Sequence, residues 1–243
     1  MSMLVPRDKF KNIVYNDIDE LLVNLFKVVK ERPGELQKRL LLMPFSKAVF
    51  GECKRLVESG EVYKLDPVEK AAVFFYVISN SFNAEMDSIK VSVLYSDAKR
   101  HMRKVLALTD IAKHLLDVAI ENRDFRDIIR LYDRDYTLFY CDPPYLDVVV
   151  GDRYIDRYID RKKHYRYTFT ERDMVDLLDL LSKIRGRFVL KLPEDHLQIS
   201  FVREWLEKHK YSMKIVEHHS LMKKNIATPR EKQRTVLIYN YEA

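Results

Sequence analysis

The chain has 243 residues, of which 47% are hydrophobic and 33% charged, with only 5 glycines and 8 prolines. This balance supports one large or two small folded domains and excludes disordered and fibrous proteins. The 43 lysines and arginines exceed the 37 acidic residues by a net charge of +6, which suits a polyanionic partner but is also common in ordinary enzymes.

Targeting and redox features favour a cytoplasmic protein. The two cysteines, Cys53 and Cys141, lie in apolar runs and lack the spacing of a metal site or a disulfide framework. No apolar run approaches the roughly 20 residues that span a bilayer, and MSMLVPRDKFK lacks the hydrophobic region of a signal peptide. We therefore expect a cytoplasmic location, no membrane contact and no metal ion.

The first predicted elements are a strand and a helix. The apolar run 13–15 ends in Asn16 and Asp17, after which apolar residues recur at helical spacing over 18–29. Pro33, followed by a glycine, ends that helix.

Residues 31–116 are predicted to be helical, without repeats or low-complexity segments. One helix covers 49–57, a second has Asp66 as its N-cap and Pro67 at its first position, and a third runs from 102 to 116.

From residue 118 onward, strands and helices alternate. The expected strands are 118–120, 137–141, 188–192, 212–216 and 235–239, and the expected helices are 125–132, 170–182 and 201–209. This alternation favours an α/β fold with a largely parallel sheet. No helix separates the last two strands, so we expect them to form an antiparallel pair at the sheet edge.

The sharpest motif follows the apolar run 138–141 and consists of Asp142, Pro143, Pro144 and Tyr145. Open α/β sheets bind ligands at the carboxyl ends of their strands, although the same four residues also suit an ordinary turn. Asp142 and the carbonyl of Pro143 offer two acceptors for the hydrogens of a nucleobase amine, and Tyr145 offers a flat face for stacking. The motif therefore fits methyl transfer to such an amine without a metal or a covalent intermediate.

LFYCDPPY, with AIENRDFRDIIRLYD before it, resembles motif IV and its upstream helix in the Dam-type, D12-class DNA adenine N6-methyltransferases. Other segments resemble further parts of the family in the same order. Motif II is matched by YNDIDELLVNLFKVVKERPGEL and the segment after it by VFFYVISNSFNAE. The regions after motif IV are matched by YRYTFTERD and GRFVLKLPEDH, and the closing strand is matched by RTVLIYNY. The resemblance implies a Rossmann-like sheet and methylation of adenine N6 in double-stranded DNA by S-adenosylmethionine. It assigns 1–30 and 117–243 to the catalytic domain and 31–116 to a helical target-recognition insertion.

The resemblance also implies roles for individual residues. Asp142, Pro143, Pro144 and Tyr145 match the catalytic motif, and Asp142 also borders the cofactor. Asp17 matches the acid that receives the cofactor's ribose hydroxyls, with a helix cap as the alternative reading. Asp124 and Phe125 match the pair that flanks the cofactor adenine, and their alternative roles are an N-cap and a core side chain.

Two basic groups are candidates for DNA contact. The first mixes cations with aromatic rings, which favours nucleic acid, and comprises Arg161, Lys162, Lys163, His164, Tyr165 and Arg166. The second lies on neighbouring turns of a predicted helix and comprises Lys99, Arg100, Arg103 and Lys104. A solvated helix face is the alternative reading of the second group.

The family's cofactor site begins with a glycine-rich turn, of the type Phe-x-Gly-x-Gly, that has no match here. The glycines are isolated, at Gly34, Gly51, Gly60, Gly151 and Gly186. In this fold the strand before that turn lies between the strands that end at Asp17 and Cys141. Residues 1–11 are too few to form both that strand and the helix that follows the turn. We expect a small second chain to supply them. The alternatives are a homodimer or a cofactor-free, non-catalytic nucleic-acid-binding relative, and cytosine N4 is an alternative target.

Overall fold

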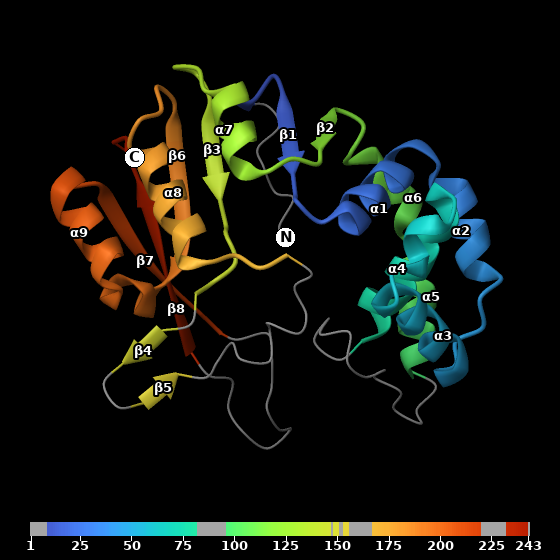
Figure 1. Ribbon diagram of the computed structural model, residues 1–243. Helices are drawn as coiled ribbons and strands as arrows, with labels where there is room; N and C mark the ends of the chain where they lie inside the picture. Colours follow the sequence, from blue (N-terminus) through green and yellow to red (C-terminus); the bar gives the residue numbers. More distant parts are fainter. Residues whose placement is uncertain are drawn as a thin grey trace. The chain divides into compact units, whose positions relative to one another are not determined.

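The computed structural model describes residues 9–81, 96–146, 148–150, 153–155, 167–219 and 232–242. It divides into two compact units, Met1–Arg123 and Asp124–Ala243, each with its own hydrophobic core (Figure 1). Both units contain helices and strands, so the expected α/β class is confirmed. The boundary between the units reflects which residues pack together, and it differs from the predicted boundaries of the catalytic domain and the target-recognition insertion. The division into those two functional regions stays a prediction.

The first unit combines a two-stranded sheet with a group of helices. Strand β1 (Ile13–Asn16) pairs in parallel with β2 (Val118–Glu121). The helical elements are α1 (Glu20–Glu31), α2 (Pro33–Leu41), α3 (Lys47–Glu58), the 3-10 turn η2 (Glu61–Lys64), α4 (Pro67–Asn80), α5 (Ser96–Leu106) and α6 (Leu108–Lys113). Helix α4 packs against α1, α2 and α3 and buries apolar residues around most of its circumference, as a central helix must.

Local sequence explains where several of these helices begin and end. Asp19 caps α1 by accepting the N–H of Leu21 at 2.9 Å, and Asp66 caps α4 with Pro67 at its first position, as predicted. The predicted helix 102–116 is instead broken at Ala107 and ends at Lys113.

The break has a tertiary cause. The side-chain amide of Gln37, on α2, donates to the carbonyls of Val105 and Leu106 at 3.1 and 3.3 Å. Those carbonyls would otherwise accept from N–H groups one turn further along, so an inserted side chain interrupts the helical ladder.

The second unit is built on a four-stranded sheet with the order β3-β6-β8-β7. Strands β3 (Leu138–Cys141) and β6 (Arg187–Pro193) are parallel, and β8 (Lys232–Tyr239) runs antiparallel to both β6 and β7 (Ser212–His219). The remaining elements are α7 (Phe125–Tyr132), the hairpin of β4 (Val148–Val150) and β5 (Arg153–Ile155), α8 (Glu171–Leu181), the 3-10 turn η5 (Glu194–Gln198) and α9 (Ser200–His209). The expected antiparallel pair is confirmed, with the last strand between β6 and β7.

The two faces of this sheet differ in burial. Phe188, Leu190 and Leu192 of β6 are completely buried in the core to which α7, α8 and α9 also contribute. On the opposite face of β3, Leu138 and Tyr140 are 37% and 63% exposed. Within the described residues, β1 and β3 each have a partner strand on one side only, so each sheet ends in an unpaired edge.

His101 is a buried polar side chain of the first unit. It is 3% exposed, its ring lies among Phe45, Phe75 and Tyr76, and its Nδ1 accepts from the amide of Asn80 at 3.0 Å. Burial lowers the pKa of His101 from 6.5 to about 4, and the positive charge of Lys104 adds to this effect. The ring is therefore neutral in the folded protein at physiological pH.

We predict that this histidine makes the first unit acid-sensitive. In the unfolded chain, His101 binds a proton below about pH 6.5, whereas in the folded protein it does so only near pH 4. The free energy of unfolding therefore falls as the pH is lowered from 6.5 to 4. The free energy of unfolding should drop by about 2 kcal/mol between pH 7.5 and pH 5 from this group alone. Urea unfolding followed by far-ultraviolet circular dichroism measures the change.

Two glutamine variants provide the comparison. His101→Gln should lose most of this pH dependence, whereas His114→Gln, at an exposed histidine of the same unit, should keep it. An unchanged pH dependence in His101→Gln would contradict the assignment.

Within the described residues, no helix has both the length and the apolar character needed to cross a membrane.

Candidate functional site

The Asp-Pro-Pro-Tyr motif forms the loop at the carboxyl end of β3. Side chains alternate along a strand, so Asp142 continues the face of Tyr140. Cys141 pairs with Leu190 of β6, which makes Asp142 and Lys191 the next neighbours along the two parallel strands. The Nζ of Lys191 donates to Oδ2 of Asp142 at 3.0 Å.

Tyr145 contacts the same carboxylate from within the loop. Its hydroxyl donates to Oδ1 of Asp142 at 3.2 Å, and its ring meets His196 edge to face with centroids 5.8 Å apart. Burial raises the pKa of Tyr145 and the charge of Asp142 raises it further, while Lys191 offsets part of this. Tyr145 therefore keeps its hydroxyl proton and remains a donor at neutral pH.

His196 holds the far end of the loop. It is completely buried in η5, and its Nε2 accepts the backbone N–H of Leu146 at 2.9 Å. Because Nε2 is the acceptor, the ring proton lies on Nδ1, which donates to Asp195 at 3.1 Å. The motif is thus anchored to the β6–η5 segment at both of its ends.

Sequence reasoning did not single out Lys191 or His196, although both lie in the stretch GRFVLKLPEDH. The available signal for Lys191 was a lone cation inside the apolar strand FVLKLP. For His196 no local signal existed, because its contact with the loop is made across 50 residues.

Cys141 is the last residue of β3 and borders the motif. Burial, followed by the nearby charge of Asp142, raises the pKa of its thiol to about 12, so it stays protonated. In the part of the chain that the structure describes, no three His, Cys, Asp or Glu side chains are grouped to hold a metal ion.

Asp124 and Phe125 lie at the start of α7. Asp124 caps this helix by accepting the N–H of Arg126 at 2.8 Å, and the Phe125 ring packs 6.1 Å from that of Phe169. The guanidinium of Arg126 lies over Phe125, 4.3 Å from the ring centre. Both residues thus have structural roles, and their contact with the cofactor stays a prediction.

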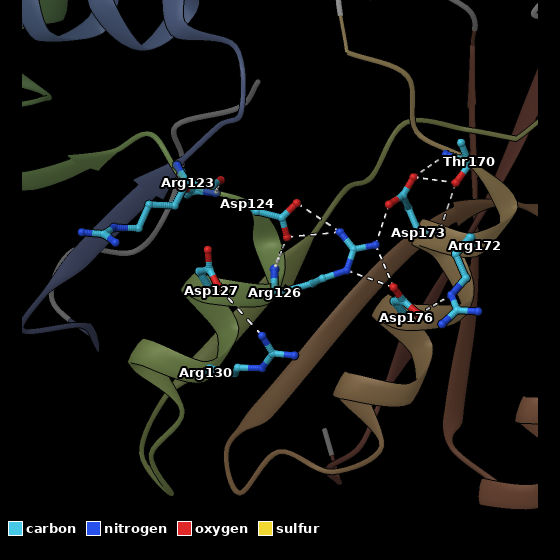
Figure 2. A network of polar contacts seen from close by, with 10 residues as sticks. Arg123, Asp124, Arg126, Asp127, Arg130, Thr170, Arg172, Asp173 and Asp176 are labelled. Carbon is cyan, nitrogen blue, oxygen red and sulfur yellow. Dashed lines mark hydrogen bonds and ion pairs between the residues drawn. The ribbon is translucent and has the colours of Figure 1, made fainter.

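Arg126 joins α7 to α8 through three carboxylates (Figure 2). Its Nη2 donates to Asp173 at 2.5 Å and to Asp176 at 2.9 Å, and its Nη1 donates to both oxygens of Asp124. The hydrogen bond from Arg126 lowers the pKa of Asp176. Asp173 also forms a capping box with Thr170 at the start of α8.

Asp17 lies in the first unit at the carboxyl end of β1 and is half-buried. Its Oδ1 accepts the N–H of Asp19 and its Oδ2 accepts the hydroxyl of Tyr15, each at 2.9 Å. Asn122 donates to the carbonyls of Asp17 and Ile18, which ties the ends of β1 and β2 together. Each carboxylate oxygen has two lone pairs, so the positioned side chain can still accept from a diol such as a ribose.

The DNA-contact candidates divide between described and undescribed residues. Arg161, Lys162, Lys163, Tyr165 and Arg166, with His164 among them, lie outside the described residues.

The second group lies on α5, with all four cations exposed. Arg100 pairs with Asp97 at 3.1 Å, and Lys104 donates to the carbonyl of Ser79. Phosphate contact by Lys99 and Arg103 stays a prediction.

Comparison with known proteins places this arrangement in a family. The family model described as D12 class N6 adenine-specific DNA methyltransferase matches residues 2–223. No match was found among curated proteins. Because the matched span covers most of the 243 residues and includes both β1 and the motif after β3, the chain belongs to the D12 class of N6 adenine-specific DNA methyltransferases.

Proposed function

We propose that this protein methylates adenine N6 in double-stranded DNA with S-adenosylmethionine as the methyl donor. The observation that carries the proposal is the carboxylate of Asp142 at the carboxyl end of a parallel strand, held by Lys191 and Tyr145. Membership of the D12 class supports adenine in DNA as the substrate.

The residues of the loop suit this chemistry. The lone pair of an aromatic amine is delocalised into its ring, so hydrogen-bond acceptors for the amine hydrogens make the nitrogen a better nucleophile. Asp142 and the carbonyl of Pro143 are such acceptors, and Tyr145 offers its ring to a base that has left the double helix. S-adenosylmethionine supplies a methyl group on a sulfonium centre. Transfer to the amine nitrogen would break the bond between this sulfur and its methyl group, leave S-adenosylhomocysteine as the second product and release one hydrogen of the amine as a proton.

We assign the remaining site residues by the same proposal. Asp17 accepts hydrogen bonds from the ribose hydroxyls of the cofactor, and Asp124 and Phe125 border its adenine. The predicted contacts to DNA are made by Arg161, Lys162, Lys163, Tyr165 and Arg166 and by Lys99 and Arg103 of α5.

We further propose that a second, small polypeptide completes the catalytic domain. The 243 residues contain no glycine-rich turn, and β1 and β3 each have an unpaired edge among the described residues. A strand bound along such an edge would satisfy backbone groups that are otherwise left open, and a helix that follows a strand at the edge of β3 would cover Leu138 and Tyr140. The turn between them would offer N–H groups to the cofactor's carboxylate.

Nucleoside analysis tests the proposed reaction. The protein is incubated with DNA and S-adenosylmethionine, alone and with the products of small neighbouring genes, and the DNA is digested to nucleosides. N6-methyldeoxyadenosine supports the proposal, and N4-methyldeoxycytidine would show that the target is cytosine. DNA binding without methylation in every combination would identify a non-catalytic DNA-binding relative.

Calorimetry tests the second chain separately. S-adenosylmethionine should bind only when the partner is present, and the chain expressed alone should self-associate in light scattering. A well-folded monomer that binds the cofactor by itself would refute the two-chain proposal while leaving the proposed reaction intact.

A further inference from the structure

Lys191 interrupts a strand whose other side chains are mostly apolar. Along β6, completely buried Phe188, Leu190 and Leu192 alternate with the partly exposed Val189 and Lys191. Lys191 therefore points to the face opposite the core, the same face as Asp142, which directly follows the neighbouring strand β3.

The contact between the two charges gives Asp142 a fixed orientation. A carboxylate on a surface loop is free to turn about its side-chain bonds. Here Oδ2 is bound by Lys191 from β6 and Oδ1 by the hydroxyl of Tyr145. Burial lowers the pKa of Lys191, but its hydrogen bond to Asp142 and the carboxylate's charge outweigh this and raise it. The ammonium is therefore present at neutral pH, and each oxygen keeps a lone pair for an incoming amine.

We propose that Lys191 is a positioning residue that orients the carboxylate of Asp142 before the target base arrives. The inference rests on the proposed methyl transfer and adds to it a residue outside the Asp-Pro-Pro-Tyr motif. A pre-oriented acceptor lowers the reorganisation needed for reaction, whereas a misplacement by about 1 Å costs about a hundredfold in rate.

The ion pair contributes little to folding, which makes its role separable. The side chains of Lys191 and Asp142 are 29% and 43% exposed. Ion pairs with such exposure stabilise a fold by about 1 kcal/mol at most. Loss of Lys191 should thus leave the melting temperature nearly unchanged while it affects turnover.

The test compares three variants of the full chain, together with the second chain wherever activity requires it. Lys191→Met keeps the aliphatic stem and removes the charge and the donors, and it should lower kcat by about 10- to 100-fold. Its KM for DNA and for S-adenosylmethionine should stay within twofold of wild type. Lys191→Arg, which retains a cationic donor, should restore most of the loss.

Lys183→Met is the matched control, because Lys183, just beyond the end of α8, forms an exposed ion pair with Asp179 of that helix at 2.6 Å. It should leave kcat unchanged. If wild type methylates adenine and Lys191→Met keeps wild-type kcat, or if Arg restores no more activity than Met, the inference is overturned and the proposed function stands. If wild type methylates nothing, the proposed function fails and the inference fails with it.

Discussion

Replacement of Asp142 by asparagine is expected to lower kcat for methyl transfer by at least about 100-fold, the usual cost of removing one hydrogen-bonding group that stabilises a transition state. The substitution keeps the size of the side chain but replaces one carboxylate oxygen, an acceptor, by an NH₂ donor. The amide would turn its remaining oxygen toward the ammonium of Lys191, now 3.0 Å from Oδ2, which leaves the NH₂ group where Oδ1 now accepts. The measurement is transfer of labelled methyl groups to DNA, followed by nucleoside analysis.

Folding and DNA affinity should survive this change, because Asp142 is 43% exposed and lies on a loop. The control is Asp179→Asn on α8, which also removes a carboxylate from an exposed ion pair with a lysine. The control variant should retain wild-type kcat. A kcat of Asp142→Asn within a few-fold of the wild-type value would contradict the catalytic role assigned to Asp142.

Gly186→Ala is expected to destabilise the second unit by about 2 to 3 kcal/mol, the range for overpacking of a tight site. A Cβ at Gly186 would lie 2.7 Å from the carbonyl oxygens of both Arg134 and Thr137. Neither can retreat freely, because Arg134 accepts the N–H of Thr137 and Thr137 accepts the N–H of Arg187. The absence of a side chain at Gly186 thus lets β6 begin directly beside β3.

Gly51→Ala provides the control. A Cβ there meets nothing within 4 Å, and the residue is exposed within α3, so alanine should stabilise that helix by about 0.5 to 1 kcal/mol. Trp205, the single tryptophan, is buried in the core of the second unit and reports on that unit by fluorescence. A urea midpoint by Trp205 fluorescence that is unchanged in Gly186→Ala would contradict the steric argument.

Elements whose causes are local were predictable from the sequence. Asp66 followed by Pro67 marks the start of α4, and the apolar run before Asp142 marks the strand that presents the motif. The predicted strands and helices after residue 118 are all found in that order, because each carries its own periodicity, whereas the short strands β4 and β5 and the 3-10 turn η5 were missed.

Features that depend on distant residues were not predictable in this way. The predicted helix 102–116 continues in the amino-acid pattern, and its break comes from Gln37, 68 residues away from Val105. Likewise, Lys191 and Asp142 are separated by 49 residues, and only the register of β3 with β6 brings them together. The periodicity of apolar residues predicts which face of a helix or strand a side chain lies on, but it does not predict which distant side chain contacts it.

The ion pairs of Arg126 with Asp124, Asp173 and Asp176 affect how DNA binding responds to salt. Affinity for DNA falls with ionic strength in proportion to the cations that meet phosphates and release counterions. Arg126 is only 24% exposed and already bonds to three carboxylates, which carry more negative charge than it carries positive. The positive charge of Arg126 is therefore already neutralised by its neighbours, and Arg126 adds nothing to the salt dependence of DNA binding. Near α7 and α8, the attraction for DNA is weaker than the formal net charge of +6 suggests.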